Sequence, residues 1–286
     1  MLSEECLSAR TRLVNGVCAD SIQQRCIMQF GCKCCDNEPA ERINVGRFLT
    51  KMDGFLNTND MSGAERCLDY WAKEAAALGD KRGLLTVTNE QIGFYRRLGD
   101  KDKAVVACEK ALQLLAELDV EGTVSGETVA VNIATTLGAY GMFDRAMAVF
   151  ADVDDAFRRN DATDSYEYAA FVNNLASTQY LCGMYDKAES NLMRAVELLR
   201  KEGNHLYDIA VSMCLLAELY RKKYNDTQKS LQVLDEAWTV LCDENIVRDG
   251  NYAFALTKCY PVFAEFGLDM QAEALKEIAA EIYGGN

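Results

Sequence analysis

Five cysteines crowd into an 18-residue stretch near the start of the chain: Cys18, Cys26, Cys32, Cys34 and Cys35. Thiolates at such short spacing can bind zinc tetrahedrally, which makes Cys26, Cys32, Cys34 and Cys35 candidate zinc ligands. The stretch holds no pair of C-x-x-C motifs, however, and Cys18 and Cys26 lie eight residues apart, as neighbours on one buried helix face do. Incidental thiols are therefore the favoured interpretation, and a cysteine-based metal or redox sensor stays open as an alternative.

Residues for other kinds of catalysis are scarce. The only histidine, His205, lies in a predicted connection between helices, where we expect it to be solvated, and one histidine excludes multi-histidine metal centres and hydrolytic triads. No glycine loop of a phosphate-binding kind is present. The acidic stretch from Asp152 to Asp164 lacks the glycine and the terminal glutamate of a calcium loop. The sequence predicts no enzyme and no cofactor.

Composition narrows the classes of partner. The 44 acidic and 30 basic residues give a formal charge of −14, which disfavours nucleic-acid backbones and anionic membranes. No apolar run is long enough to cross a bilayer, and charged residues interrupt the first 15 positions, where a signal peptide would be apolar. The cysteines from Cys67 to Cys259 occur singly in helical patterns, as small buried hydrophobes do. We expect a soluble cytoplasmic protein.

A 42-residue repeat indicates which elements would position any functional side chain. Small residues recur at this spacing, each preceded five positions earlier by glycine or asparagine and followed seven positions later by another small residue. Such a period, with two helical segments in each, is typical of a solenoid of stacked helix pairs. The small residues are Ala104, Ala146, Ala188, Ser230 and Ala272; the turn residues are Gly99, Gly141, Gly183, Asn225 and Gly267; the later residues are Ala111, Val153, Ala195, Ala237 and Ala279.

The apolar pattern predicts about six antiparallel helix pairs, with a degenerate first pair in which Val45–Leu56 faces Ala64–Trp71. Pro261 falls inside a helix of the last pair, which we expect it to kink or interrupt. We expect two domains: residues 1–41 as a cysteine-rich N-terminal helical cap, and residues 42–286 as the repeat domain.

Several segments resemble the tetratricopeptide repeat (TPR), in the 42-residue variety of kinesin light chains. They are Asn173-Asn174-Leu175-Ala176, Gly183-Met184-Tyr185-Asp186-Lys187-Ala188, and the similar turns that begin at Gly99 and Gly141. The resemblance covers about residues 42 to 283. It implies an all-α, right-handed superhelix of antiparallel helix pairs, a TPR-like α-solenoid whose first helices line a concave groove. It also implies a non-catalytic scaffold or adaptor that binds a protein or an extended peptide there.

In this family, asparagines of the first helices often clamp the ligand backbone, and Asn132 and Asn174 match those positions. An amide offers both a donor and an acceptor to a peptide group. The predicted basic residues, Arg96, Arg221 and Lys222, could capture a carboxylate or an acidic peptide. Alternatively, they could serve only to interact favourably with the helix dipole. The asparagines could likewise bond a neighbouring repeat or water instead of a ligand. The predicted groove residues are Asn89, Arg96, Asn132, Thr135, Asn173, Asn174, Ser177, Tyr180, Arg221 and Lys222.

Two further interpretations stay open besides the scaffold and the cysteine sensor. The repeats could form a peptide-responsive signalling regulator, as in bacterial quorum-peptide receptors, in which the ligand changes the pitch of the superhelix. The end helices could also support a homodimer.

Overall fold

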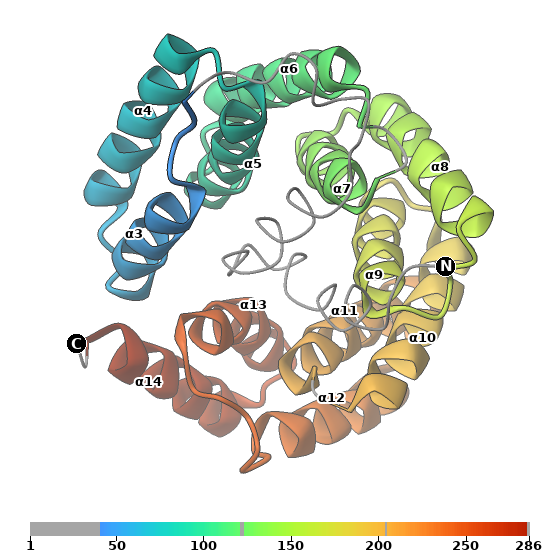
Figure 1. Cartoon of the computed structure of the whole chain (residues 1–286). Coiled ribbons are helices and arrows are strands. Elements are labelled where there is room, and N and C mark those ends of the chain that lie inside the picture. Colours follow the sequence, from blue (N-terminus) through green and yellow to red (C-terminus); the bar gives the residue numbers. More distant parts are fainter. Residues whose placement is uncertain (1–40, 121–122, 204, 285–286) are drawn as a thin grey trace. The chain divides into compact units, whose positions relative to one another are not determined.

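The computed structural model describes residues 41–120, 123–203 and 205–284, and every regular element in this part of the chain is a helix (Figure 1). Contacts divide these helices into two compact units. The first unit holds α3 (Val45–Asn57), α4 (Met61–Leu78), α5 (Lys81–Leu98), α6 (Lys101–Leu118), α7 (Val124–Ala139) and α8 (Phe143–Arg159). The second unit holds α9 (Tyr166–Leu181), α10 (Tyr185–Glu202), α11 (Leu206–Tyr224), α12 (Thr227–Leu241), α13 (Gly250–Glu265) and α14 (Asp269–Gly284).

Consecutive helices form antiparallel pairs, three in each unit over the described residues. This confirms the predicted all-α repeat of about six helix pairs. The predicted cap at residues 1–41 lies outside the described residues except for its last position, and the division at residue 42 stays a prediction.

Small buried residues set the spacing of the repeat. The second helices of five pairs begin at Lys101, Phe143, Tyr185, Thr227 and Asp269, which are 42 residues apart. The fourth residue of each is the predicted small one, and its burial lets the second helix approach its neighbours closely. Ala104, Ala146, Ala188 and Ser230 are fully buried, and Ala272 is 7% exposed.

The turn inside each pair depends on a left-handed residue. Gly99, Gly141, Gly183 and Gly267 have φ between 72° and 80°, and Asn225 takes the same region with φ of 52°. Glycine adopts this conformation without steric cost, and asparagine is among the residues that tolerate it best. The predicted turns are therefore confirmed, including the one in which asparagine replaces glycine.

Aspartates cap several helices at their start. Asp100 and Asp226 accept hydrogen bonds from the backbone amides of Lys103 and Lys229, at 3.1 and 2.9 Å. Asp80 is 2% exposed and accepts from the amides of both Gly83 and Ile43, at 2.9 and 3.1 Å. This buried carboxylate thereby joins the start of α5 to the segment that precedes α3.

The degenerate first pair packs as predicted. Phe48 and Met52 of α3 are buried in one core cluster with Leu68 and Trp71 of α4, and the rings of Phe48 and Trp71 lie 6.1 Å apart. In the second unit, Leu192 of α10 and Leu219 of α11 occupy a comparable cluster. Each unit therefore buries its own apolar core.

Of the two effects expected of Pro261, a kink or an interruption, the interruption does not occur, because α13 continues through Pro261 to Glu265. Proline removes one backbone bond and disfavours the helix one turn earlier. Here Val262 is 8% exposed and Phe263 is fully buried, so packing of the last turn outweighs the lost bond.

None of the described helices combines the length and the apolar character that crossing a membrane requires.

The buried small residue gives a direct test of the repeat register. Ala188→Leu should lower the free energy of unfolding by roughly 1 to 3 kcal/mol, because the side chain has no free space between packed helices. Urea denaturation followed by circular dichroism measures this change. Ala148→Leu on the exposed face of α8 is the matched control and should be nearly neutral. Equal stability of the two variants would contradict the register.

Candidate functional site

The first helices of successive pairs run parallel within each unit, and side-chain hydrogen bonds join them. In the second unit two such bonds join α9 to α11, one at the start of α9 and one near its middle. Tyr166 of α9 donates to Asp208 of α11 at 3.2 Å, and the Ser212 hydroxyl of α11 donates to Asn173 Oδ1 at 2.8 Å. We call the half-buried polar surfaces of α5 and α7, and of α9, α11 and α13, the first-helix faces of the two units.

Three predicted site residues meet on the first-helix face of the first unit. The Asn132 Nδ2 group of α7 donates to Asn89 Oδ1 of α5 at 2.9 Å. Arg96 of α5 reaches the same helix, since its Nη1 donates to the Asn132 carbonyl at 3.3 Å and to Thr136 Oγ1 at 2.8 Å. Burial lowers the pKa of Arg96. These contacts hold α5 against α7.

In the second unit the predicted asparagines take different partners. Asn173 accepts the bond from Ser212, whereas Asn174 Nδ2 donates to the Ala170 carbonyl of its own helix at 2.8 Å. The Asn173 Nδ2 and Asn174 Oδ1 atoms have no hydrogen-bond partner among the described residues. One donor and one acceptor thus stay unused on neighbouring residues of α9.

Thr135 and Ser177, which are 42 residues apart, are also half-buried on first helices. The Thr135 hydroxyl donates to the Val131 carbonyl one turn earlier, at 2.7 Å. Its oxygen lone pairs can still accept.

The predicted basic residues differ in their surroundings. Arg221, near the end of α11, pairs with the Glu265 carboxylate and stacks on Phe266, with its guanidinium 4.1 Å from the ring centre. Lys222 is exposed. Arg96 and Arg221 both bond groups of this chain. That either of them captures a ligand carboxylate stays a prediction.

The predicted aromatic residue lies beside the same charges. Tyr180 packs its ring 5.8 Å from that of Tyr185. Burial first, and then the charges of Glu218 and Glu265, raise its pKa. Burial and Glu265 also raise the pKa of Glu218. The ends of the first helices in the second unit therefore carry mixed charge.

Sequence reasoning missed Glu90 of α5, a half-buried carboxyl that follows Asn89 on the first-helix face of the first unit. Burial, followed by the charge of Asp53, raises its pKa from the usual 4.5 to about 7, although the Asn89 side chain opposes the shift. The 42-residue register contained a signal, because Glu90, Asn132 and Asn174 occupy equivalent positions.

The expectation of a solvated His205 is wrong. The ring stacks on Tyr166 with centres 3.6 Å apart, and burial lowers the pKa of the imidazole to about 4. Desolvation disfavours the charged form, and this effect prevails even though the Asp208 carboxylate is 3.8 Å away. His205 is therefore a neutral packing residue at neutral pH.

Cysteines and metals add no second site within the described ranges. The six cysteines there are free thiols, and Cys67, Cys108, Cys214 and Cys259 are buried as predicted, whereas Cys182 is half-buried and Cys242 is exposed. No group of three or more metal-ligating side chains occurs in this part of the chain. The candidate zinc ligands Cys26, Cys32, Cys34 and Cys35 lie outside the described residues.

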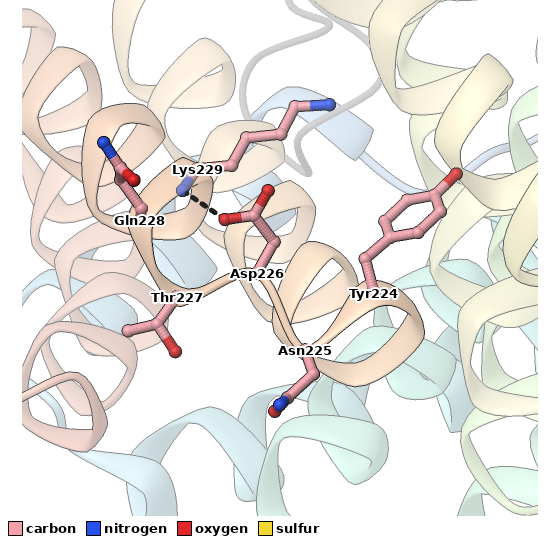
Figure 2. A pocket seen from close by; sticks show the side chains of 6 residues that line it. All are labelled: Tyr224, Asn225, Asp226, Thr227, Gln228 and Lys229. Atoms are coloured by element: carbon pink, nitrogen blue, oxygen red, sulfur yellow. Dashed lines mark hydrogen bonds between the residues drawn. The ribbon is translucent and has the colours of Figure 1, made fainter.

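An open hollow lies at the turn between α11 and α12, and none of the predicted site residues lines it (Figure 2). It is lined by one continuous segment, Tyr224 to Lys229. Asp226 occupies the start of α12 as its cap, so the backbone amide of Lys229 is already bonded. This turn has a structural role.

Glu90 predicts a specific dependence of stability on pH. Well below pH 4.5 the Glu90 carboxyl is protonated in both the folded and the unfolded chain, so its burial as a charged group costs no free energy of unfolding. As the pH rises from 4.5 towards 7, only the unfolded chain loses the proton, so the free energy of unfolding falls. Glu90→Gln should therefore be more stable than the natural chain by roughly 1 to 3 kcal/mol at pH 8, with little difference near pH 4. Urea denaturation at both pH values measures this. A difference that does not change with pH would contradict the assignment.

Comparison with known proteins agrees with this architecture. Residues 167–241 and 94–114 match models of the tetratricopeptide repeat. No curated protein matches the chain.

Solved structures share the fold. The crystal structure of BtubC (BKLC) from P. vanneervenii is 25% identical, with a TM-score of 0.58, over 68% of this chain and 79% of that one. A Rap protein complexed with Competence and Sporulation Factor is 13% identical, with a TM-score of 0.54, over 83% and 74%. The apo form of RapI is 12% identical, with a TM-score of 0.54, over 84% and 97%. The chain therefore contains tetratricopeptide repeats at residues 94–114 and 167–241, within a fold that it shares with these helical-repeat structures.

Proposed function

We propose that this protein is a non-catalytic scaffold that binds a segment of a protein or peptide partner on its first-helix faces. The observation that carries the proposal is the unused hydrogen-bonding capacity of the repeated asparagines. Asn132 Oδ1, Asn173 Nδ2 and Asn174 Oδ1 have no partner among the described residues, although each amide is fixed by a bond through its other atom. Amides held in this way can bond a peptide backbone with little further loss of side-chain entropy.

A backbone clamp fits the chemistry of these groups. An extended peptide presents alternating N–H and C=O groups, and the free donor and free acceptor on Asn173 and Asn174 complement both. Such contacts do not read the ligand's side chains, so they provide affinity but leave specificity to neighbouring residues.

A second candidate is a peptide-responsive regulator. It is favoured by the division of the chain into two compact units and by the shared fold with a Rap protein complexed with Competence and Sporulation Factor. A regulator of this kind requires that the bound ligand changes the global shape of the protein. Small-angle scattering with and without a bound peptide distinguishes a regulator, whose profile changes, from a scaffold, whose profile does not.

Homodimerisation through the end helices remains a separate prediction. Light scattering of the purified protein over a range of concentrations tests it.

Selection of peptides and one asparagine variant test the proposal. Peptides selected from a phage library of random dodecapeptides by the full chain should bind Asn174→Ala about three- to tenfold more weakly, which corresponds to one lost hydrogen bond. Isothermal titration calorimetry measures the affinity. Folding should be unchanged, because the Asn174 side chain bonds only its own helix.

Asn245→Ala is the matched control, since Asn245 is exposed in the connection between α12 and α13. It should keep full affinity. If Asn174→Ala binds as well as this control, or loses stability in proportion to affinity, the asparagine is structural and the proposal is wrong.

A further inference from the structure

Arg96 of α5 is a half-buried cation that forms no ion pair with any residue that the structure describes. Its Nη1 atom donates to the Asn132 carbonyl and to Thr136 Oγ1 of α7, at 3.3 and 2.8 Å. The Nε and Nη2 atoms, which form another edge of the guanidinium, have no hydrogen-bond partner in the same part of the chain. The bonds to α7 therefore fix the side chain and leave one edge with unused N–H donors.

This arrangement leaves the charge of Arg96 without compensation. Burial removes water from the guanidinium and so lowers its pKa. The carbonyl and the hydroxyl that accept from Nη1 are neutral groups, so they bond the cation without balancing its charge. A carboxylate would balance the charge, and its two oxygens can accept parallel bonds from Nε and Nη2.

The helix that carries Arg96 is basic, although the chain as a whole is acidic. One acidic residue, Glu90, and four basic residues lie on α5, whereas the chain has a formal charge of −14. Glu90 precedes Arg96 by six residues, about 9 Å along the helix axis, so it does not neutralise the guanidinium at contact distance. A partner's anionic group thus meets an excess of positive charge on α5. The basic residues are Lys81, Arg82, Arg96 and Arg97.

Gly93 leaves open space next to Arg96 on the same helix. Asn89, Gly93 and Arg96 follow one another at intervals of four and three residues, so they share one face of α5. A Cβ atom added at Gly93 would meet no atom within 4 Å. Glycine weakens a helix relative to alanine, and neither packing nor a left-handed backbone requires it here. The missing side chain gives another chain close access to α5 between Asn89 and Arg96.

We propose that the Nε–Nη2 edge of Arg96 binds the side-chain carboxylate of an aspartate or glutamate in a partner segment that passes over Gly93. This inference rests on the proposed function and adds specificity to it. Arg96 bonds the backbone of Asn132, whose side chain is one of the proposed clamps of the partner's backbone. The partner is therefore acidic in the part that contacts α5 and α7.

The first test selects random dodecapeptides on phage with three forms of the full chain. They are the natural protein, Arg96→Gln, and the control Arg66→Gln, which removes the same charge from the exposed surface of α4. Each peptide is fused to the coat protein through its C-terminus, so only side-chain carboxylates are offered. We expect the natural protein and Arg66→Gln to enrich aspartate or glutamate at one fixed position at least threefold over the starting library. We expect folded Arg96→Gln to select peptides without this preference.

The second test keeps Arg96 and fills the space beside it. Gly93→Leu should bind a peptide selected by the natural protein at least tenfold more weakly, as measured by isothermal titration calorimetry. Its urea midpoint should not fall, because no atom packs against Gly93. The control Ala148→Leu adds the same side chain to the exposed face of α8 and should keep full affinity. The natural protein should bind an analogue with the acidic residue replaced by its amide at least threefold more weakly.

The outcomes separate this inference from the function on which it rests. Selection with no acidic position, the same acidic position in Arg96→Gln, or equal affinity for the peptide and its amide analogue overturns the Arg96 site alone. Full affinity of folded Gly93→Leu also overturns it. If circular dichroism shows that Arg96→Gln is unfolded, the amide analogue and Gly93→Leu decide the question. Failure of every folded protein to select any peptide overturns the proposed function, and the Arg96 site with it.

Discussion

The structure depends on the close approach of helices at one small residue in each repeat. Ala104, Ala146, Ala188 and Ser230 have no exposed surface, and the second helices that carry them begin at a constant interval of 42 residues. Ser230 keeps the approach although it is polar, because the carbonyls of Ala217 and Asp226, at 2.8 and 2.9 Å, share the single proton of its hydroxyl. A larger side chain would force the helices apart, so this contact fixes the register on which every other position depends.

That register also decides which polar side chains meet. Because the first helices of each unit run parallel, residues about 40 positions apart lie next to each other, as Asn89 does to Asn132 and Asn173 to Ser212. These bonds use Asn132 Nδ2 and Asn173 Oδ1, and they leave Asn132 Oδ1 and Asn173 Nδ2 available to a ligand. The same constraint that packs the core therefore prepares a row of oriented polar groups on the opposite side of the first helices.

The sequence was sufficient to predict the helix pairs, because the positions that determine them are repeated. The glycines and Asn225 at the turns, the capping aspartates and the small residues follow local rules of backbone geometry and packing. The interruption expected at Pro261 does not occur because the buried Phe263 outweighs a local preference, and the solvated His205 was wrong because stacking on Tyr166 is a tertiary contact. The candidate site stays a prediction: the repeat placed Asn89, Arg96 and Asn132 on one surface, where they do meet, but the internal bonds of Arg96 and Arg221 depend on rotamers. Glu90 was missed because its burial and its distance from Asp53 are not local properties.

The central claim is that partners bind on the first helices rather than the second. Hydrogen–deuterium exchange of the full chain, with and without a saturating selected peptide, tests it most directly. The account predicts slower exchange in α5, α7, α9 or α11 on binding, with α6, α10 and α12 unchanged. Protection confined to the second helices would contradict it.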